Sequence, residues 1–151
     1  MKITITVGSL LDDIYAGSAL QAISHITSSS SAGASLLTPD RRAALRRFII
    51  VAAAELAGGL ARRLLSFTPP DPAGENDHDD AIEFEVAEPV ALTPDALRCH
   101  LSSAMTFGVL RLVALASGDY PRADAFEACR LAAIATIDPC PPRLRRPAHW
   151  A

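Results

Sequence analysis

One short segment of the sequence has side chains that could bind a metal ion. His78 lies among Asp77, Asp79 and Asp80, and carboxylate oxygens together with an imidazole nitrogen are suitable ligands for a divalent cation. The segment lacks the regularly spaced carboxylates and the closing bidentate glutamate of a calcium-binding loop. We therefore favour a solvated acidic loop and predict no metal-binding residues.

Residues suited to catalysis do not occur at useful spacings. Cys99 and His100 are adjacent in an expected helix, so their side chains point about 100° apart and cannot form a nucleophile–base pair. Asp12 and Asp13 open another expected helix, where carboxylates complement the helix dipole. No Gly-rich phosphate loop and no known nucleophile or metalloprotease motif occurs. We predict a non-enzymatic protein without catalytic residues or a cofactor.

Paired arginines at 41–42, 46–47 and 62–63 suggest binding to nucleic acid. The helix expected around them lacks polar side chains that read base edges, and its middle is too apolar to lie in a groove. A pI near 5.7 also argues against this function. We favour the interpretation that these arginines flank a buried helix. A small helical interaction or regulatory module that binds nucleic acid through these pairs is the alternative.

Length and composition indicate one helical domain. The chain has 151 residues, and half of them are apolar, mostly Ala and Leu, whereas only 5% are aromatic. This bias favours packed helices over a β-sandwich, which needs β-branched and aromatic residues. Charge is uneven, because residues 71–88 hold eight acidic residues and no Lys or Arg. This acidic segment is expected to face either a DNA passage or water.

The three cysteines, Cys99, Cys129 and Cys140, have no metal-ligand spacing and no even pairing. They favour a reducing compartment, and we expect Cys99 and Cys129 to be buried in helices. The N-terminus alternates Ile and Thr instead of forming the apolar core of a signal peptide. Residues 48–60 are too short an apolar run to span a bilayer. We expect a buried core helix there and no membrane association.

The N-terminal half is expected to form a strand and two helices. Residues 2–7 alternate in polarity, which predicts a short strand, and Ser9 is a suitable N-cap for a helix over 9–25. In the alternative, the helix begins nearer Thr6 and the strand is lost. Residues 27–35 are Ser-rich and predict a flexible loop.

The second helix has the clearest predicted start in the sequence. Thr38 is the expected N-cap, Pro39 the first helical residue and Asp40 a charge that complements the dipole. The helical pattern continues to about Phe67, before two prolines. The helix is apolar nearly all round, which is typical of a helix central to a fold or an assembly. Gly58 and Gly59 predict a kink or a close helix contact near its end.

The C-terminal half is expected to form a strand and two more helices. Residues 68–80 predict a loop, and residues 82–86 alternate as a strand, which must pair with 3–7 or with another subunit. Thr93 and Pro94 predict a helix start that matches the one at Thr38, and this helix runs to about Ala116.

In that third helix the predicted apolar face includes Ala104, Gly108, Leu112 and Leu115. Ala104 and Gly108 are four residues apart and would let another helix approach closely. A fourth helix should follow Asp119 or Tyr120, with Pro121 at its start, and run to about Ile137 through residues 126, 129 and 134.

The predicted fold is therefore mainly α, with four helices and one or two short β-strands. A single helical domain spans residues 1–137, and residues 138–151 form a basic, Pro- and Arg-rich tail that we expect to be disordered.

The order of these elements resembles small proteins of tailed phages and prophages, notably of the Bacteroides-type group. Those chains share a Leu-x-Asp-Asp-Ile/Val-Tyr helix, a Leu-Thr-Pro-Asp start to a long apolar helix, an acidic loop with a strand, and two final helices. The matching residues here lie at 11–15, 37–40 and 82–86, with the third helix over 97–116.

The resemblance implies a structural, virion-assembly protein, and specifically a helical head–tail connector or neck protein. It implies a homo-oligomeric ring, other phage structural proteins as partners, and a position near DNA. It implies no small-molecule substrate and no catalytic residues, with the protein in the cytoplasm during assembly and then in the virion.

Overall fold

The computed structural model describes residues 1–25, 42–74, 76–77, 79–88 and 90–139. In these residues four helices and three strands follow one another, and the predicted mainly α class is confirmed. The elements are β1 (Lys2–Thr6), α1 (Val7–His25), α2 (Arg42–Gly59), β2 (Leu64–Thr68), β3 (Ala81–Val86), α3 (Pro94–Ala116) and α4 (Tyr120–Ile137).

The strand predicted at 82–86 is the centre of a three-stranded antiparallel sheet. β3 pairs with β1 on one side and with β2 on the other, so both of its edges are hydrogen-bonded within the chain. Ile82, Phe84 and Val86 alternate toward the core and are almost completely buried. Pairing with β1 was one of the two predicted solutions, so the strand needs no neighbouring subunit.

The second helix is shorter than predicted, because it ends at Gly59 and not at Phe67. Two glycines in succession weaken the helix by about 1 kcal/mol each, and the chain turns through hydrogen bonds from Arg63 N–H and Leu64 N–H to the Leu60 carbonyl. The following residues then pair with the open edge of β3, where Phe67 lies opposite Phe84. The gain from sheet pairing therefore replaces the last part of the predicted helix.

Strand β1 leads directly into α1, so neither prediction for this region was fully correct. The helix begins at Val7, yet the strand before it is kept. Thr6 and not Ser9 is the cap: the Ser9 N–H donates to the Thr6 hydroxyl at 3.3 Å, and the Ser9 hydroxyl donates to the Thr6 carbonyl at 2.9 Å. Asp12 and Asp13 consequently lie beyond the first turn, where the dipole effect has faded.

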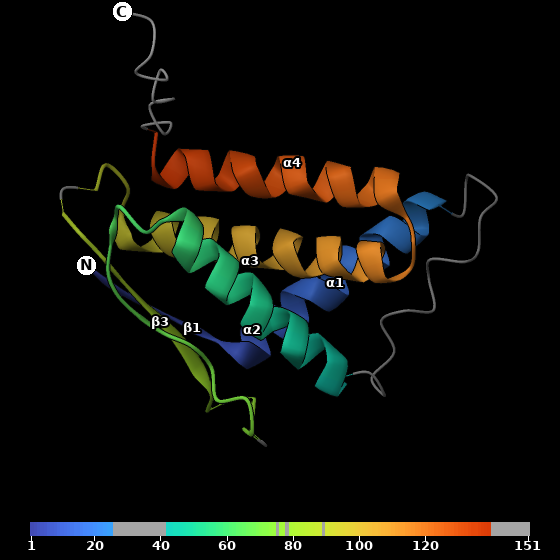
Figure 1. Ribbon diagram of the computed structural model, residues 1–151, viewed down its shortest axis with the longest axis horizontal. Helices are drawn as coiled ribbons and strands as arrows, with labels where there is room; N and C mark the ends of the chain where they lie inside the picture. The colour runs from blue at the N-terminus through green and yellow to red at the C-terminus, as the bar shows by residue number, and fades with distance from the viewer. Residues whose placement is uncertain (26–41, 75, 78, 89, 140–151) are drawn as a thin grey trace, which may run out of the picture.

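Helix α3 is the central helix of the fold, with α4 along one side and α1, α2 and the sheet on the other (Figure 1). Its predicted cap is confirmed, because the Thr93 hydroxyl accepts from the Ala96 N–H at 3.3 Å. Asp119 caps α4 in the same way, accepting from the Arg122 N–H at 3.2 Å. By length and composition alone, α3 is also apolar enough to cross a membrane, and it is the one such helix among the described residues.

Gly108 of α3 lies where α2 crosses it, as the small residues in the sequence predicted. A β-carbon placed on Gly108 would lie 3.1 Å from the β-carbon of Ala52. Ala104 is buried on the same face. The C-terminal part of the apolar face predicted for α3 was wrong, because Leu112 is only half-buried and Leu115 is 40% exposed.

Both cysteines that the structure describes were predicted incorrectly. Cys99 and Cys129 are exposed, on the outer sides of α3 and α4. Part of the circumference of each helix is left uncovered by its neighbours, and these cysteines lie there. The predicted loop at 27–35, the predicted cap at 38–40 and Cys140 lie outside the described residues, as does the predicted tail from residue 140 onward.

Candidate functional site

The acidic segment between β2 and β3 folds onto α2 around one buried arginine. The guanidinium of Arg46 makes ion pairs with Asp77 and Asp80. It also donates from Nε and Nη2 to the carbonyl of Asp71, at 3.2 Å and 2.7 Å. Arg46 is 7% exposed and Asp77 is 5% exposed. Charges this deeply buried need such partners, so this cluster is a fixed part of the fold.

The same segment holds the start of α1 through its backbone. The N–H groups of Val7 and Gly8 donate to the carbonyls of Asp80 and Asp77, at 3.0 Å and 2.8 Å. The first N–H groups of a helix have no partner within the helix. The acidic segment therefore supplies these partners and connects the N-terminal halves of α1 and α2.

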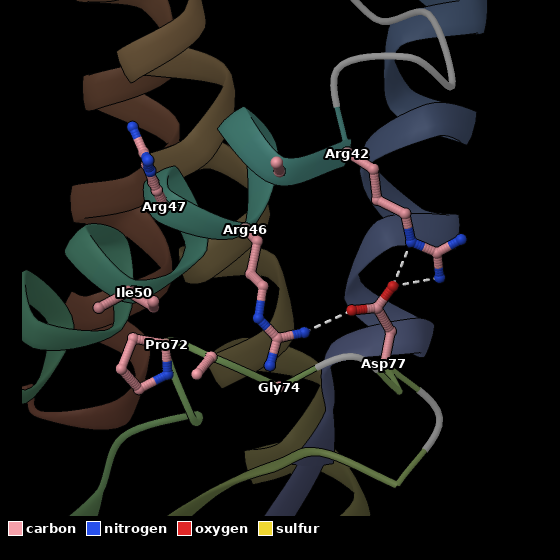
Figure 2. A pocket seen from close by; sticks show the side chains of 9 residues that line it. Arg42, Arg46, Arg47, Ile50, Pro72, Gly74 and Asp77 are labelled. Atoms are coloured by element: carbon pink, nitrogen blue, oxygen red, sulfur yellow. Dashed lines mark hydrogen bonds and ion pairs between the residues drawn. The ribbon is translucent and has the colours of Figure 1, made fainter.

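A second arginine and a glycine complete the cluster. Arg42, one turn before Arg46, also makes an ion pair with Asp77, although its side chain is 58% exposed. On the other side, Gly74 packs directly against the Arg46 guanidinium, where any side chain would collide with it. Figure 2 shows Arg42 and Arg46 converging on Asp77.

These contacts correct the prediction of a solvated acidic loop. Asp77 is buried and Asp80 is half-buried, although Asp79 is exposed as expected. No group of three or more His, Cys, Asp and Glu side chains in the described residues could hold a metal ion. His78, the imidazole of the predicted alternative, lies outside that part of the chain. The predicted interpretation was arginines that flank a buried helix, but Arg46 lies one turn inside α2 and is itself buried.

A cleft of about 640 Å³ opens beside this cluster, between α2 and the loop that follows β2. One wall is a single face of α2, because residues 43, 46, 47 and 50 recur at helical spacing. The opposite wall consists of Pro72, Ala73 and Gly74. Arg47 is exposed, points away from Asp77 in Figure 2, and has no ion-pair partner in the described part of the chain.

A second group of charges joins α2, α3 and α4. Arg111 of α3 makes ion pairs with Glu55 of α2 at 2.5 Å and with Glu127 of α4 at 3.3 Å. Arg130 donates to Glu127 at 2.6 Å and 2.8 Å. The hydrogen bond from Arg130 holds the pKa of the Glu127 carboxyl below its ordinary value. This network connects α2, α3 and α4, and this structural role accounts for its charged residues.

The fold does not bring together the residues that were considered as catalysts and rejected from the sequence. Cys99 is exposed and its neighbour His100 is half-buried. Asp13 lies on α1, where partial burial raises the pKa of its carboxyl and the negative charge of Asp12 raises it further. In the part of the chain that the structure describes, none of these side chains pairs with another as nucleophile and base. The sequence did not reveal the Arg46 cluster, and its one signal was the arginine pair 46–47 near the start of an apolar helix.

The outer face of α4 is a helical surface that the described fold leaves uncovered. α4 lies along α3 at the side of the molecule away from the sheet (Figure 1), and only its C-terminal part approaches the end of α2. Leu131 is 51% exposed on this helix. The other exposed residues of α4 include five small ones, Ala125, Ala128, Cys129, Ala132 and Ala135, together with Tyr120, Asp124 and Thr136.

No protein-family model, curated protein or solved structure matches this chain.

Proposed function

We propose that this chain is a non-enzymatic assembly protein that works as a homo-oligomer, of the kind found at the head–tail junction of phages and prophages. The observation that carries this proposal is the outer face of α4. It combines five small side chains with the exposed Leu131, and it has few charges. An uncovered apolar surface of this kind is typical of protein–protein contact.

Helix α2 adds weaker support, because Val51 in its apolar middle is 43% exposed. The strand at 82–86 gives no support to the oligomer, since it pairs fully within the chain. The connector identity itself rests on the resemblance in the order of elements and in residues 11–15 and 37–40. The α4 surface supports the proposed oligomeric state, and that resemblance supports the proposed virion location.

The alternative, a module that binds nucleic acid through its arginine pairs, has less support from the geometry. Arg46 is buried and Arg42 is paired with Asp77, so two of these arginines are not free to neutralise phosphates. A DNA-binding constant that falls steeply with salt would favour this alternative, because phosphate neutralisation releases counterions.

Light scattering of the purified full chain tests the oligomer. We expect a mass several times that of the 16.0 kDa monomer, with the variant Ala128→Glu/Leu131→Glu shifted toward the monomer. Arg98→Glu is the matched control, because Arg98 is an exposed residue of α3 and lies outside the α4 surface. A strictly monomeric wild-type chain at high concentration contradicts the proposal.

The virion location has its own test. We expect mass spectrometry of purified particles, induced from cells that carry the gene in a prophage, to detect this chain together with portal and tail proteins. Its absence from particles that contain those proteins would contradict the connector identity, while an oligomer in solution would still stand.

A further inference from the structure

The cleft beside the Arg46 cluster has an uneven charge. Two of its arginines, Arg42 and Arg46, are paired with Asp77 and Asp80. Arg47 lines the same cleft, is exposed, and has no ion-pair partner among the described residues. The described lining therefore has one positive charge that no carboxylate compensates.

The rest of the lining is apolar. Ile50 is half-buried on α2 beside Arg47, and Pro72 and Ala73 face it from the loop. A volume of about 640 Å³ falls within the range of about 300–1,000 Å³ that is typical of small-ligand sites. One charge at the edge of an apolar wall is suited to a ligand with one anionic group and an apolar body.

Carboxylate is the anion that this arrangement favours. A guanidinium presents a planar fork of N–H donors that pairs with the two oxygens of a carboxylate. A phosphate dianion would leave one negative charge uncompensated beside the carboxylates of Asp77 and Asp80. We propose that this cleft binds a carboxylate group attached to a short apolar body, with Arg47 holding the carboxylate and Ile50, Pro72 and Ala73 holding the body.

The walls of the cleft are built to keep their shape. Arg46 is fixed by two carboxylates and one carbonyl, and Gly74 is packed against it. The loop that forms the opposite wall is thereby attached to α2, so a ligand meets a preformed surface. The inference does not depend on the proposed assembly function, because the cleft and the outer face of α4 belong to different elements.

Titration of the full chain with hexanoate, followed by NMR of its backbone amides, tests the proposal. We expect saturable shifts at Arg47, Ile50 and Ala73. Hexanol carries the same apolar body without the charge, and we expect it to bind at least about tenfold more weakly. Absence of saturable shifts with hexanoate, or equal binding of hexanol, overturns the proposal.

Substitutions assign the binding to the cleft. Arg47→Gln should weaken hexanoate binding about tenfold or more, because a charge-assisted hydrogen bond is lost. Ala73→Trp should weaken it by filling the cleft while every charge is kept. Arg98→Gln, which removes an exposed arginine on α3, should leave it unchanged. Both test residues are exposed, so we expect the melting temperatures to stay close to wild type. Equal binding by Arg47→Gln and wild type overturns the assignment.

Two sources could supply such a carboxylate, and peptides distinguish them. The pentapeptide Gly-Ser-Ala-Leu-Leu is compared with a free C-terminus and with an amidated one. Tighter binding of the free acid than of hexanoate identifies the end of a polypeptide as the ligand. Weaker binding of the free acid identifies a small organic acid. Equal binding of the free and amidated peptides shows that the carboxylate is not recognised and overturns the proposal.

Discussion

The backbone of Gly74 lies against the guanidinium of Arg46, and the two leave no space for a β-carbon between them. From this position Arg46 makes ion pairs with Asp77 and Asp80 and donates to the Asp71 carbonyl. The missing side chain is therefore what lets the acidic loop close over a buried positive charge. Loop and helix meet at this contact, and both walls of the cleft depend on it.

Replacing Gly74 with alanine should destabilise the protein. The new methyl group would displace the Arg46 guanidinium, and overpacking of this kind costs about 1–3 kcal/mol. Urea unfolding measures the loss. Gly58→Ala is the matched control, because a β-carbon at Gly58 meets nothing within 4 Å, and a gain in helix propensity of up to about 1 kcal/mol is expected there. Equal stability of the two variants would refute the role of Gly74.

Removing the buried arginine should have a larger effect. Arg46→Met keeps most of the apolar stem but leaves Asp77 and Asp80 without their shared cation, and breaking a buried pair in this way costs about 3–5 kcal/mol. Arg98→Gln removes an exposed pair with Asp95, for which about 0–1 kcal/mol is expected. Thermal and urea unfolding compare the two variants. If Arg46→Met loses no more than Arg98→Gln does, the cluster does not stabilise the fold.

Local signals in the sequence predicted the helix starts that the structure describes in the C-terminal half. Thr93 and Asp119 are caps whose side chains reach only three residues along the chain, so a short window of sequence contains the whole interaction. Strand β2 was missed because its stability comes from pairing with β3, about twenty residues away. Residues 64–67 continue a helical apolar pattern, and only the neighbouring strand decides their conformation.

The Arg46 cluster could be predicted only in part. The sequence shows two arginine pairs near the start of an apolar helix and a separate acidic loop, but it does not show which carboxylate reaches which guanidinium. That choice depends on the turn after Gly59 and on the close approach at Gly74. The prediction that Cys99 and Cys129 are buried was wrong for a similar reason. Composition does not reveal which side of a helix stays uncovered.

Acid should weaken the network among α2, α3 and α4 through Glu127. Its carboxyl has a lowered pKa because Arg130 donates hydrogen bonds to it. A lowered carboxyl pKa stabilises the fold above the unfolded-state value, and this contribution is lost as the pH falls through the folded-state pKa. We expect Glu127→Gln to cost about 0.5–1 kcal/mol at pH 7, since solvent screens the pair. The difference from wild type should shrink as the pH falls through the folded-state pKa of Glu127, as measured by urea unfolding at each pH.

The carboxyl of Asp13 should change the stability with pH in the opposite direction. Burial and the charge of Asp12 raise the pKa of its carboxyl, so the folded state holds its proton more tightly than the unfolded state does. Stability is then lost as the pH rises through the folded-state value. Asp13→Asn should therefore stabilise the protein slightly at pH 7 and have no charge effect near pH 2. A destabilising effect at pH 7 that disappears in acid would contradict this prediction.

The crossing of α2 and α3 should tolerate no larger residue at Gly108. Its absent β-carbon would lie 3.1 Å from the β-carbon of Ala52, so Gly108→Leu must push the two helices apart and should cost about 1–3 kcal/mol. Gly108→Ala needs a smaller shift, partly offset by a gain of about 1 kcal/mol in helix propensity.

A double-mutant cycle locates this cost at the contact between the two helices. With Ala52→Gly the opposing methyl group is removed, and Gly108→Ala should then be tolerated better than it is opposite Ala52. Residues in contact typically show a coupling free energy of about 0.5–3 kcal/mol, and urea unfolding of the four proteins measures it. Arg98→Gln in place of Ala52→Gly provides the uncoupled comparison, because Arg98 is exposed near the start of α3. Strict additivity of Gly108→Ala and Ala52→Gly would show that this contact does not set the spacing of α2 and α3.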